Sequence, residues 1–283
     1  MIQINQDEFR LFRKYLSGEC GIDVPEEKSY LFSTRLADLV NEEQYQSFKE
    51  LYMALTGNPE TNLKQKVIEV MTTNETAFFR DGHPFNTFRS VILPDLTARR
   101  ISESLYMPPQ ISIWSMGCST GQEVYSIAML VDEWLEKEEN FSRERVFITA
   151  SDLSREVLEK ASSGFYSDLE IKKGLKDLHL VKNFSRKNNG WQVNEKLRKM
   201  ISFKQFNMAE EFLYDVDSVD IIFCRNVIIY FSKELKQKLL EGFFQSLRPG
   251  GVLIMGASEN IYMMSDKFEV VYYENSMYYR VKK

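Results

Sequence analysis

The chain has 283 residues, of which 43% are hydrophobic and 27% are charged, a composition ordinary for a globular protein with a sizeable core. It contains no run of about 18 apolar residues, and its first residues lack the basic flank and apolar core of a signal peptide, so we expect a cytoplasmic protein that does not insert into membranes. The formal net charge of −5 argues against a nucleic-acid substrate, because enzymes that bind nucleic acid draw most of their affinity from basic contacts to phosphate.

Cysteine and histidine usage gives no sign of a metal centre. Cys20, Cys118 and Cys224 are far apart and form neither a metal-binding pattern nor a disulfide framework, as is usual in a reducing compartment. The two histidines, His83 and His179, are isolated from each other in the sequence. We therefore expect no metal site, and we assign neither histidine a catalytic role.

The first part of the chain is predicted to be helical. Its apolar residues recur near helical spacing, and no alternating strand pattern competes. These residues are Phe9, Phe12, Leu16, Leu31, Leu36, Leu39 and Val40, with a further helical stretch at 63–71. We expect a small all-helical domain over residues 1–75.

From about residue 110 the pattern changes to strands that alternate with helices. The apolar runs of the strands are continuous, which is typical of a mainly parallel sheet covered by helices on both faces. The predicted strands are 111–116, 146–150, 219–224 and 252–255, and the predicted helices are 123–135, 155–161 and 233–247, with a turn at 248–251.

Two antiparallel features interrupt this alternation. The Asn-Asn-Gly sequence at 188–190 is a strong hairpin turn, which predicts a small antiparallel β-subdomain inserted at about residues 165–205. Residues 268–273 and 276–281 have the pattern of a terminal hairpin. A parallel sheet closed by an antiparallel pair suits a class I methyltransferase fold better than a plain dinucleotide-binding fold, and we expect this domain to span residues 76–283.

A glycine-containing loop, Gly117 to Gly121, links the first predicted strand to its helix. Glycine there lets the backbone turn tightly and approach a ligand closely. The loop is not the dinucleotide fingerprint, because Ser119 stands where that pattern needs glycine. A purely structural strand-to-helix turn is the alternative.

Two acidic residues lie at the predicted edge of the sheet. Asp152 follows the second strand, where a carboxylate can accept hydrogen bonds from ribose hydroxyls, and a helix N-cap is the alternative. Glu123 opens the helix after the glycine loop and is placed to meet a cofactor. Its alternative is a first-turn acid that the helix dipole favours.

The strand at 219–224 leads into Arg225 and Asn226, at the edge where ligands of open α/β sheets gather. Tyr230 follows one helical turn later, where its ring can pack under the loop or its hydroxyl can reach a reacting centre. Upstream, the segment 72–80 joins the helical region to the sheet, and its spacing alone indicates nothing more than a hinge.

Five stretches of the chain resemble the chemotaxis receptor methyltransferases of the CheR family, in the family's order and over nearly the whole length. They are TNETAFFR (73–80), WSMGCSTGQEVYSIA (114–128), ASDLS (150–154), IFCRNVIIYF (222–231) and LRPGG (247–251). The first and fourth are the most specific. The resemblance implies an enzyme that uses S-adenosylmethionine to methylate glutamate side chains of membrane chemoreceptors.

The resemblance also implies which residues form the site. Glu123 and Asp152 match positions that contact the methionine or ribose part of the cofactor, and Asn207 with Met208 match an adenine-side pair. Arg80 and Tyr230 match the pair implicated in catalysis. The cofactor-binding residues are Asn74, Thr76, Arg80, Glu123, Asp152, Asn207, Met208, Arg225 and Asn226.

The implied partner is the cytoplasmic domain of a membrane chemoreceptor, and the enzyme is expected to be a monomer. Some members of the family also hold a tether peptide at the receptor C-terminus through the β-insert. Many carry an arginine-rich second helix that docks on an acidic receptor surface. In this chain the stretch that matches the second helix, residues 28–40, has only Lys28 and Arg35 as basic residues, together with the acidic Asp38. Residues 1–70 as a whole carry 8 basic and 12 acidic residues, a net of −4. This composition argues against docking through that helix.

A carboxylate acceptor explains why no catalytic base stands out. Glutamate is ionised near neutral pH, with an ordinary pKa of about 4.3, so direct in-line methyl transfer to its oxygen needs no general base. The protein must hold that oxygen in line and exclude water. Arg80 is expected to orient a carboxylate and Tyr230 to donate a hydrogen bond nearby. The alternatives are a methyltransferase for nucleic acids or small molecules, and a non-catalytic module that binds the same cofactor.

Overall fold

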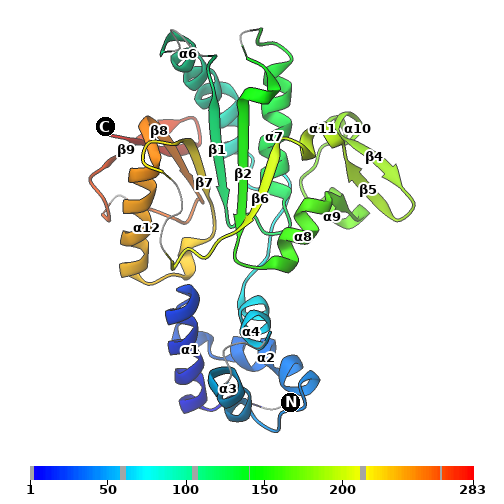
Figure 1. The fold of residues 1–283 in the computed structure, drawn as a ribbon, viewed down its shortest axis with the longest axis vertical. Helices are drawn as coiled ribbons and strands as arrows, with labels where there is room; N and C mark the ends of the chain where they lie inside the picture. Colours follow the sequence, from blue (N-terminus) through cyan, green and yellow to red (C-terminus); the bar gives the residue numbers. More distant parts are fainter. Residues whose placement is uncertain (1–2, 58–61, 104–107, 140, 211–214, 262) are drawn as a thin grey trace.

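The computed structural model describes residues 3–57, 62–103, 108–139, 141–210, 215–261 and 263–283. Figure 1 shows a helical region at the bottom, a large sheet with its helices above it, and a smaller unit with short strands on the right. The predicted class I methyltransferase fold is confirmed, with its N-terminal helical domain, terminal antiparallel hairpin and inserted antiparallel subdomain. None of the described helices is long and apolar enough to cross a membrane.

The N-terminal helices pack around one apolar core. Of the periodic residues, Leu31 is half-buried against this core, and the others, among them Phe9, Phe12 and Leu36, are buried as their helical spacing predicted. The first helix begins with a reciprocal cap: the Asn5 side chain accepts from the backbone N–H of Glu8, and the Glu8 carboxylate accepts from the N–H of Asn5. The elements are α1 (Gln6–Cys20), η1 (Glu26–Lys28), α2 (Tyr30–Glu42), α3 (Phe48–Gly57) and α4 (Leu63–Met71).

The large sheet has seven strands in the order β6-β2-β1-β7-β8-β10-β9. Neighbours from β6 to β8 are parallel, and β10 is antiparallel to both β8 and β9. The carboxyl ends of the parallel strands point toward the helical region (Figure 1). The strands are β1 (Ile111–Met116), β2 (Val146–Asp152), β6 (Ile201–Gln205), β7 (Val219–Cys224), β8 (Leu247–Met255), β9 (Phe268–Tyr273) and β10 (Ser276–Val281).

Continuous apolar strands are needed because side chains of both faces are buried. Along β7, Ile221 and Phe223 join one core cluster, while Ile222 and Cys224 join the cluster on the other face. The helical elements of this part are α5 (His83–Thr87), η2 (Phe88–Ile92), α6 (Leu93–Glu103), α7 (Gln122–Leu135), η3 (Arg143–Arg145), α8 (Arg155–Ser163), η4 (Ile228–Tyr230) and α12 (Lys233–Ser246).

The insert has an antiparallel sheet of its own, in the order β3-β5-β4. Its central hairpin turns at Asn188 and Asn189, as predicted. Residues 201–205, placed in the insert by the sequence, instead form β6, which pairs with β2 in the large sheet and buries Ile201 in the main core. The elements are β3 (Phe165–Tyr166), α9 (Asp168–Lys172), α10 (Asp177–Asn183), β4 (Phe184–Lys187), β5 (Gly190–Val193) and α11 (Glu195–Arg198).

The predicted turn at 248–251 is wrong, because these residues lie within β8. Leu247 pairs with Val219 and Val252 pairs with Ile221, so the residues between them bulge opposite Asp220 alone. Gly250 supplies the left-handed conformation that this bulge needs, with φ +65°.

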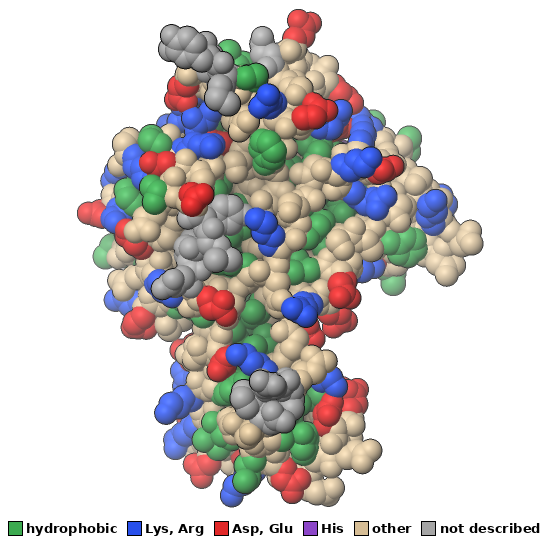
Figure 2. Space-filling model, in the orientation of Figure 1, with side chains coloured by type: hydrophobic (Ala, Val, Ile, Leu, Met, Phe, Trp, Pro, Cys, Tyr) green, Lys and Arg blue, Asp and Glu red, His purple; other side chains and the backbone are tan. Residues whose placement is uncertain are grey.

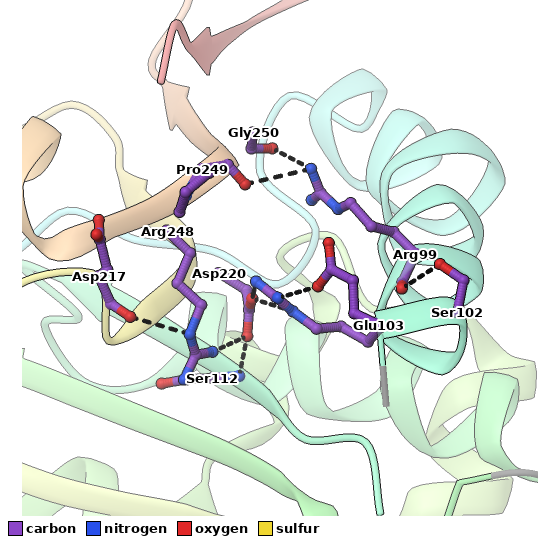
Figure 3. A network of polar contacts seen from close by, with 10 residues as sticks. Arg99, Ser102, Glu103, Ser112, Asp217, Asp220, Arg248, Pro249 and Gly250 are labelled. Carbon is purple, nitrogen blue, oxygen red and sulfur yellow. Dashed lines mark hydrogen bonds and ion pairs between the residues drawn. The ribbon is translucent and has the colours of Figure 1, made fainter. Parts of the chain in front are cut away.

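Asp220 is fully buried in β7 and is held by arginines from two elements (Figure 3). Its Oδ1 accepts from Nε of Arg100 in α6 at 2.8 Å, and its Oδ2 accepts from Nη1 of Arg248 at 2.7 Å. Oδ2 also accepts from the backbone N–H of Ser112 at 2.7 Å. A buried carboxylate is tolerated only when it is paired and hydrogen-bonded. This network therefore joins α6, β1, β7 and β8 at the sheet edge away from the helical region.

Asp220→Ala should be strongly destabilising, because it leaves Arg100 and Arg248 without their shared acceptor. We expect the free energy of unfolding, measured by urea denaturation, to fall by about 3 kcal/mol. Glu103→Ala is the control: it removes a half-exposed partner of Arg100 and should cost less than about 0.5 kcal/mol. Equal denaturation midpoints for the two variants would contradict the importance of the buried network.

Candidate active site

A cavity of about 290 Å³ lies between the carboxyl edge of the large sheet and the helical region. Every residue that the sequence suggested for the cofactor or for catalysis lines it. These residues are Asn74, Thr76, Arg80, Glu123, Asp152, Asn207, Met208, Arg225, Asn226 and Tyr230. Side chains from distant parts of the sequence therefore share one surface.

The glycines of the loop after β1 are required by close packing. Gly117 has φ +65°, and a Cβ atom there would lie 2.5 Å from Cγ2 of Val227. Gly121 has φ +95°, and a Cβ atom there would lie 2.9 Å from Cβ of Ala161. The structural-turn interpretation therefore explains both glycines, while the loop residues Gly117 and Ser119 still line the cavity.

Asp152 is buried at the end of β2 and is fixed by two backbone groups. Its Oδ2 accepts from the N–H of Ser119 at 2.8 Å, and its Oδ1 accepts from the N–H of Ser154 at 3.1 Å. Burial raises the pKa of Asp152, and these N–H groups act in the opposite direction. The N-cap of α8 is Ser154, whose hydroxyl accepts from the N–H of Val157, so the alternative role as a helix cap does not apply to Asp152.

Arg225 carries a fully buried guanidinium at the end of β7. Its Nη1 donates to Oε2 of Glu123 at 3.0 Å, and its Nη2 donates to Oδ2 of Asp81 at 2.7 Å and to the carbonyl of Arg80 at 2.9 Å. Glu123 also accepts from the hydroxyl of Ser115 at 3.0 Å. Burial raises the pKa of Glu123, and its contact with Arg225 opposes this rise. The ion pair of Glu123 and Arg225 therefore holds the segment around Arg80 against the sheet.

The segment from Asn74 to Arg80 is more than a hinge, because it is bound on several sides. The carbonyl of Asn74 accepts from the hydroxyl of Ser119 in the glycine loop at 3.1 Å. The N–H of Phe79 donates to the hydroxyl of Ser126 in α7 at 2.9 Å. Arg80 donates from Nη1 to the carbonyl of Glu75 at 2.7 Å, a contact within the segment at the cavity wall.

Sequence reasoning missed Glu259, which shapes the loop that follows β7. Its buried carboxylate accepts three backbone N–H groups: Asn226 at 2.7 Å, Val227 at 2.9 Å and Gly256 at 2.8 Å. Asn226 has φ +61°, a left-handed conformation that needs such support. The only available signal was an acid shortly after a predicted strand, which is also common in ordinary loops.

The helical region supplies one wall of the cavity, which the sequence did not indicate. The backbone N–H of Asp23 donates to the carbonyl of Tyr230 at 2.9 Å, and the Asn207 side chain donates to the carbonyl of Glu19 at 2.7 Å. Lining residues from this region are Cys20, Ile22, Asp23, Val24, Pro25, Lys28, Leu31, Arg35 and Met71. The helical region lies below the sheet in the view of Figure 1, so this wall is on the lower side of the cavity.

The chemistry of the lining suits S-adenosylmethionine. Phe206 and Met208 offer apolar surface for a base, and the cavity walls carry both acidic and basic side chains, which suits a ligand that has a cationic sulfonium and a carboxylate. Each oxygen of Asp152 accepts one backbone N–H, which leaves lone pairs for ribose hydroxyls. Among the described residues, no group of His, Cys, Asp and Glu is arranged to hold a metal ion.

Comparison with known proteins agrees with this geometry. The SAM-binding domain of the CheR methyltransferases matches residues 74–277, and the all-alpha domain of the same family matches residues 7–72. Chemotaxis protein methyltransferase Cher2 of Pseudomonas putida is 35% identical over 276 residues, which cover 97% of this chain and 98% of that protein. The chemotaxis protein methyltransferase of Borreliella burgdorferi is 33% identical over 261 residues, covering 92% and 90%.

The sheet order and the cavity at its carboxyl edge define a class I methyltransferase that uses S-adenosylmethionine. Both parts of the chain match one family in the same order, and the chain belongs to the CheR methyltransferase family.

Glu259→Gln should loosen the loop after β7 and thereby the cavity. An amide at this position places a donor against at least one of the three N–H groups that the carboxylate accepts, so that group loses its partner. We expect roughly a tenfold loss in affinity for S-adenosylhomocysteine by calorimetry, together with a lower melting temperature. Glu269→Gln, a half-exposed residue of β9, is the matched control. If the Glu259 variant bound S-adenosylhomocysteine as tightly as the wild type does, Glu259 would have no role in cofactor binding.

Proposed function

We propose that this chain transfers the methyl group of S-adenosylmethionine to glutamate side-chain carboxylates of chemotaxis receptors, forming methyl esters for sensory adaptation. The observation that carries the proposal is the cavity in which all the family-matched residues meet, in a chain that matches both CheR domains. The relatives in Pseudomonas putida and Borreliella burgdorferi are chemotaxis protein methyltransferases, and this supports a role in chemotaxis. We further propose that the enzyme acts as a cytoplasmic monomer on the cytoplasmic domain of the receptor.

We assign the cofactor-binding roles as follows. Asp152 accepts hydrogen bonds from the ribose, because its carboxylate is fixed by the backbone and keeps free lone pairs. Asn207 and Met208 border the adenine. Glu123 and Arg225 act through their buried pair, which keeps the wall of the cavity in place. Asn74, Thr76 and Asn226 complete the lining.

The chemistry of the methyl acceptor determines the roles of Arg80 and Tyr230. Bound S-adenosylmethionine supplies an electrophilic methyl group on a sulfonium, and the glutamate oxygen that receives it is already ionised near neutral pH. No residue therefore has to remove a proton. Arg80 orients the acceptor or cofactor carboxylate at the cavity wall, and Tyr230, with 36% of its surface exposed, donates a hydrogen bond at the mouth. The apolar lining excludes water, which strengthens both interactions.

The insert offers a strand edge to which a peptide could bind. The order β3-β5-β4 puts β4 at one edge of the small sheet, where an extended peptide can add as a further strand. We propose this edge as the place where a receptor C-terminal tether peptide binds, if the receptor carries one. Retained affinity for such a peptide after deletion of residues 184–193 would refute it.

Arg80→Ala and Tyr230→Phe should each lower turnover by about 10²-fold, because each removes a group that positions or stabilises the reacting atoms. The measurement is transfer of labelled methyl groups to receptor-bearing membranes of the same organism, scored as base-labile esters. Tyr272→Phe, on the exposed face of β9, is the matched control and should keep full activity. Wild-type turnover in both Arg80 and Tyr230 variants would show that these roles are wrong. A base-stable product would refute the glutamate ester itself.

Asp152 should make cofactor binding sensitive to acid. Burial raises its pKa, so the carboxylate takes up a proton at a higher pH than an ordinary aspartate, and the charged acceptor is lost as the pH falls through that value. We expect the affinity for S-adenosylhomocysteine, measured by calorimetry, to be constant near neutral pH and to decline on acidification. Asp152→Asn should bind at least about tenfold more weakly at neutral pH and show a flatter pH profile. An unchanged affinity would exclude the ribose contact.

A further inference from the structure

Positive charge is concentrated in the insert. Residues 165–200 contain 9 Lys and Arg and 4 Asp and Glu, a net of +5, in a chain whose total is −5. The helical region carries the opposite sign, with 8 basic and 12 acidic residues over 1–70. Figure 2 shows several blue side chains over the insert on the right of the molecule, and a mixture of blue and red on the helical region below.

The second helix does not offer a basic surface to a partner. The guanidinium of Arg35 is used internally: Nη1 donates to the carbonyls of Met71 and Thr72 at 2.7 and 3.2 Å, and Nη2 donates to the hydroxyl of Thr73 at 3.0 Å. Arg35 therefore fastens α2 to the start of the segment that leads to Arg80. An acidic partner has little to bind on this helix.

Three lysines of the insert are exposed and uncommitted. Lys172, Lys173 and Lys176 lie at the end of α9 and in the turn before α10, and none of them forms a side-chain hydrogen bond or ion pair with the part of the chain that the structure describes. Several other basic residues of the insert are paired, for example Lys182 with Glu136 at 2.7 Å.

The helix that follows these lysines presents an apolar outer face. Leu178 and Val181, three residues apart in α10, are 75% and 82% exposed. The opposite side of the same helix is packed inward, where Asn183 is buried and the His179 ring stacks on Phe79 at 4.6 Å. Together Leu178 and Val181 form a small apolar patch on the outer side of α10, which a partner helix could cover.

This surface is built directly onto the segment that carries Arg80. The N–H of Phe78 donates to the carbonyl of Lys173 at 3.2 Å. Gly174, with φ +91°, packs so closely that a Cβ atom there would lie 2.0 Å from the carbonyl oxygen of Phe78. A partner bound on the insert is therefore held beside the loop that forms the cavity wall.

We propose that Lys172, Lys173, Lys176, Leu178 and Val181, here called the lysine face, bind the acidic amphipathic receptor helix whose glutamates are methylated. The inference rests on the proposed function for the identity of the partner. A helix that carries several ionised glutamates is negative along one side and apolar along another. The lysines complement the first side and the two apolar residues complement the second. Charge of this kind chiefly raises the rate of productive encounter and orients the partner.

The test compares two charge-reversal variants of equal size. Lys172→Glu, Lys173→Glu and Lys176→Glu together remove the lysine face. Lys14→Glu, Lys49→Glu and Lys233→Glu together change three exposed lysines elsewhere, two of them on the helical region. The substrate is the purified cytoplasmic fragment of a chemoreceptor from the same organism. The readouts are KM and kcat for methyl transfer, binding of the fragment by sedimentation, and the Kd for S-adenosylhomocysteine.

We expect the lysine-face variant to raise KM and to weaken fragment binding by about tenfold, with kcat and cofactor Kd unchanged and with a weaker dependence on salt. Leu178→Ser with Val181→Ser should also raise KM, and because both positions are exposed, folding should be retained. The proposal is overturned if the lysine-face variant binds as the wild type does, or if the control variant loses as much affinity, which would show that the loss follows from total charge and not from the lysine face.

The two proposals can fail separately. If the wild type binds the fragment but transfers no methyl group, the proposed function fails, while sedimentation of the variants still decides the lysine face. If the wild type methylates the fragment and the lysine-face variant keeps the same KM, only the docking surface fails. If the wild type does not bind the fragment at all, the lysine face is refuted as its docking site.

Discussion

The contacts of the buried Arg225 guanidinium hold together the edge of the sheet at which the cavity lies. A charge at this depth is stable only when acceptors surround it, and here they come from α7, through Glu123, and from the upstream segment, through Asp81 and the carbonyl of Arg80. One side chain at the end of β7 therefore joins two other pieces of the chain. Because the backbone of Arg80 is itself a partner in this network, the residue assigned to orienting a carboxylate is placed by a buried ion pair rather than by a free loop.

The second constraint is that neither part of the chain forms the cavity alone. The end of α1 packs against α12 because Gly21 has φ +75° and leaves room for Leu235, whose Cδ2 would lie 2.0 Å from a Cβ atom at that position. Directly afterwards, Asp23 binds the carbonyl of Tyr230. The family match over the all-alpha region thus has a physical counterpart: the helices supply a wall of the site and tie down the backbone of a proposed catalytic residue.

The sequence predicted those elements that are determined by residues close to one another in the chain. Continuous apolar runs identified β1 and β7, and the Asn-Asn-Gly turn identified the insert hairpin, because each pattern is complete within a few residues. The family resemblance then selected residues that meet in one cavity. What it missed depends on tertiary placement. Glu259 has no distinctive neighbours in the sequence, and its three N–H donors come from two different strand ends. The bulge in β8 has the composition of a turn, and only its pairing with β7 shows otherwise.

Charge placement and reaction chemistry support one another in this fold. An acceptor that is ionised before it reacts relieves the enzyme of proton transfer, but it also means that every candidate glutamate carries the same charge and the same reactivity. The enzyme must then select a particular glutamate by the position in which it holds the receptor, because no catalytic base distinguishes one glutamate from another. In a chain that is negative as a whole, long-range repulsion disfavours approach from most directions. The basic insert is the exception, and its packing against Phe78 and Phe79 joins it to the wall of the cavity that includes Arg80. The same surface that attracts an acidic helix can therefore present one of its carboxylates to the site.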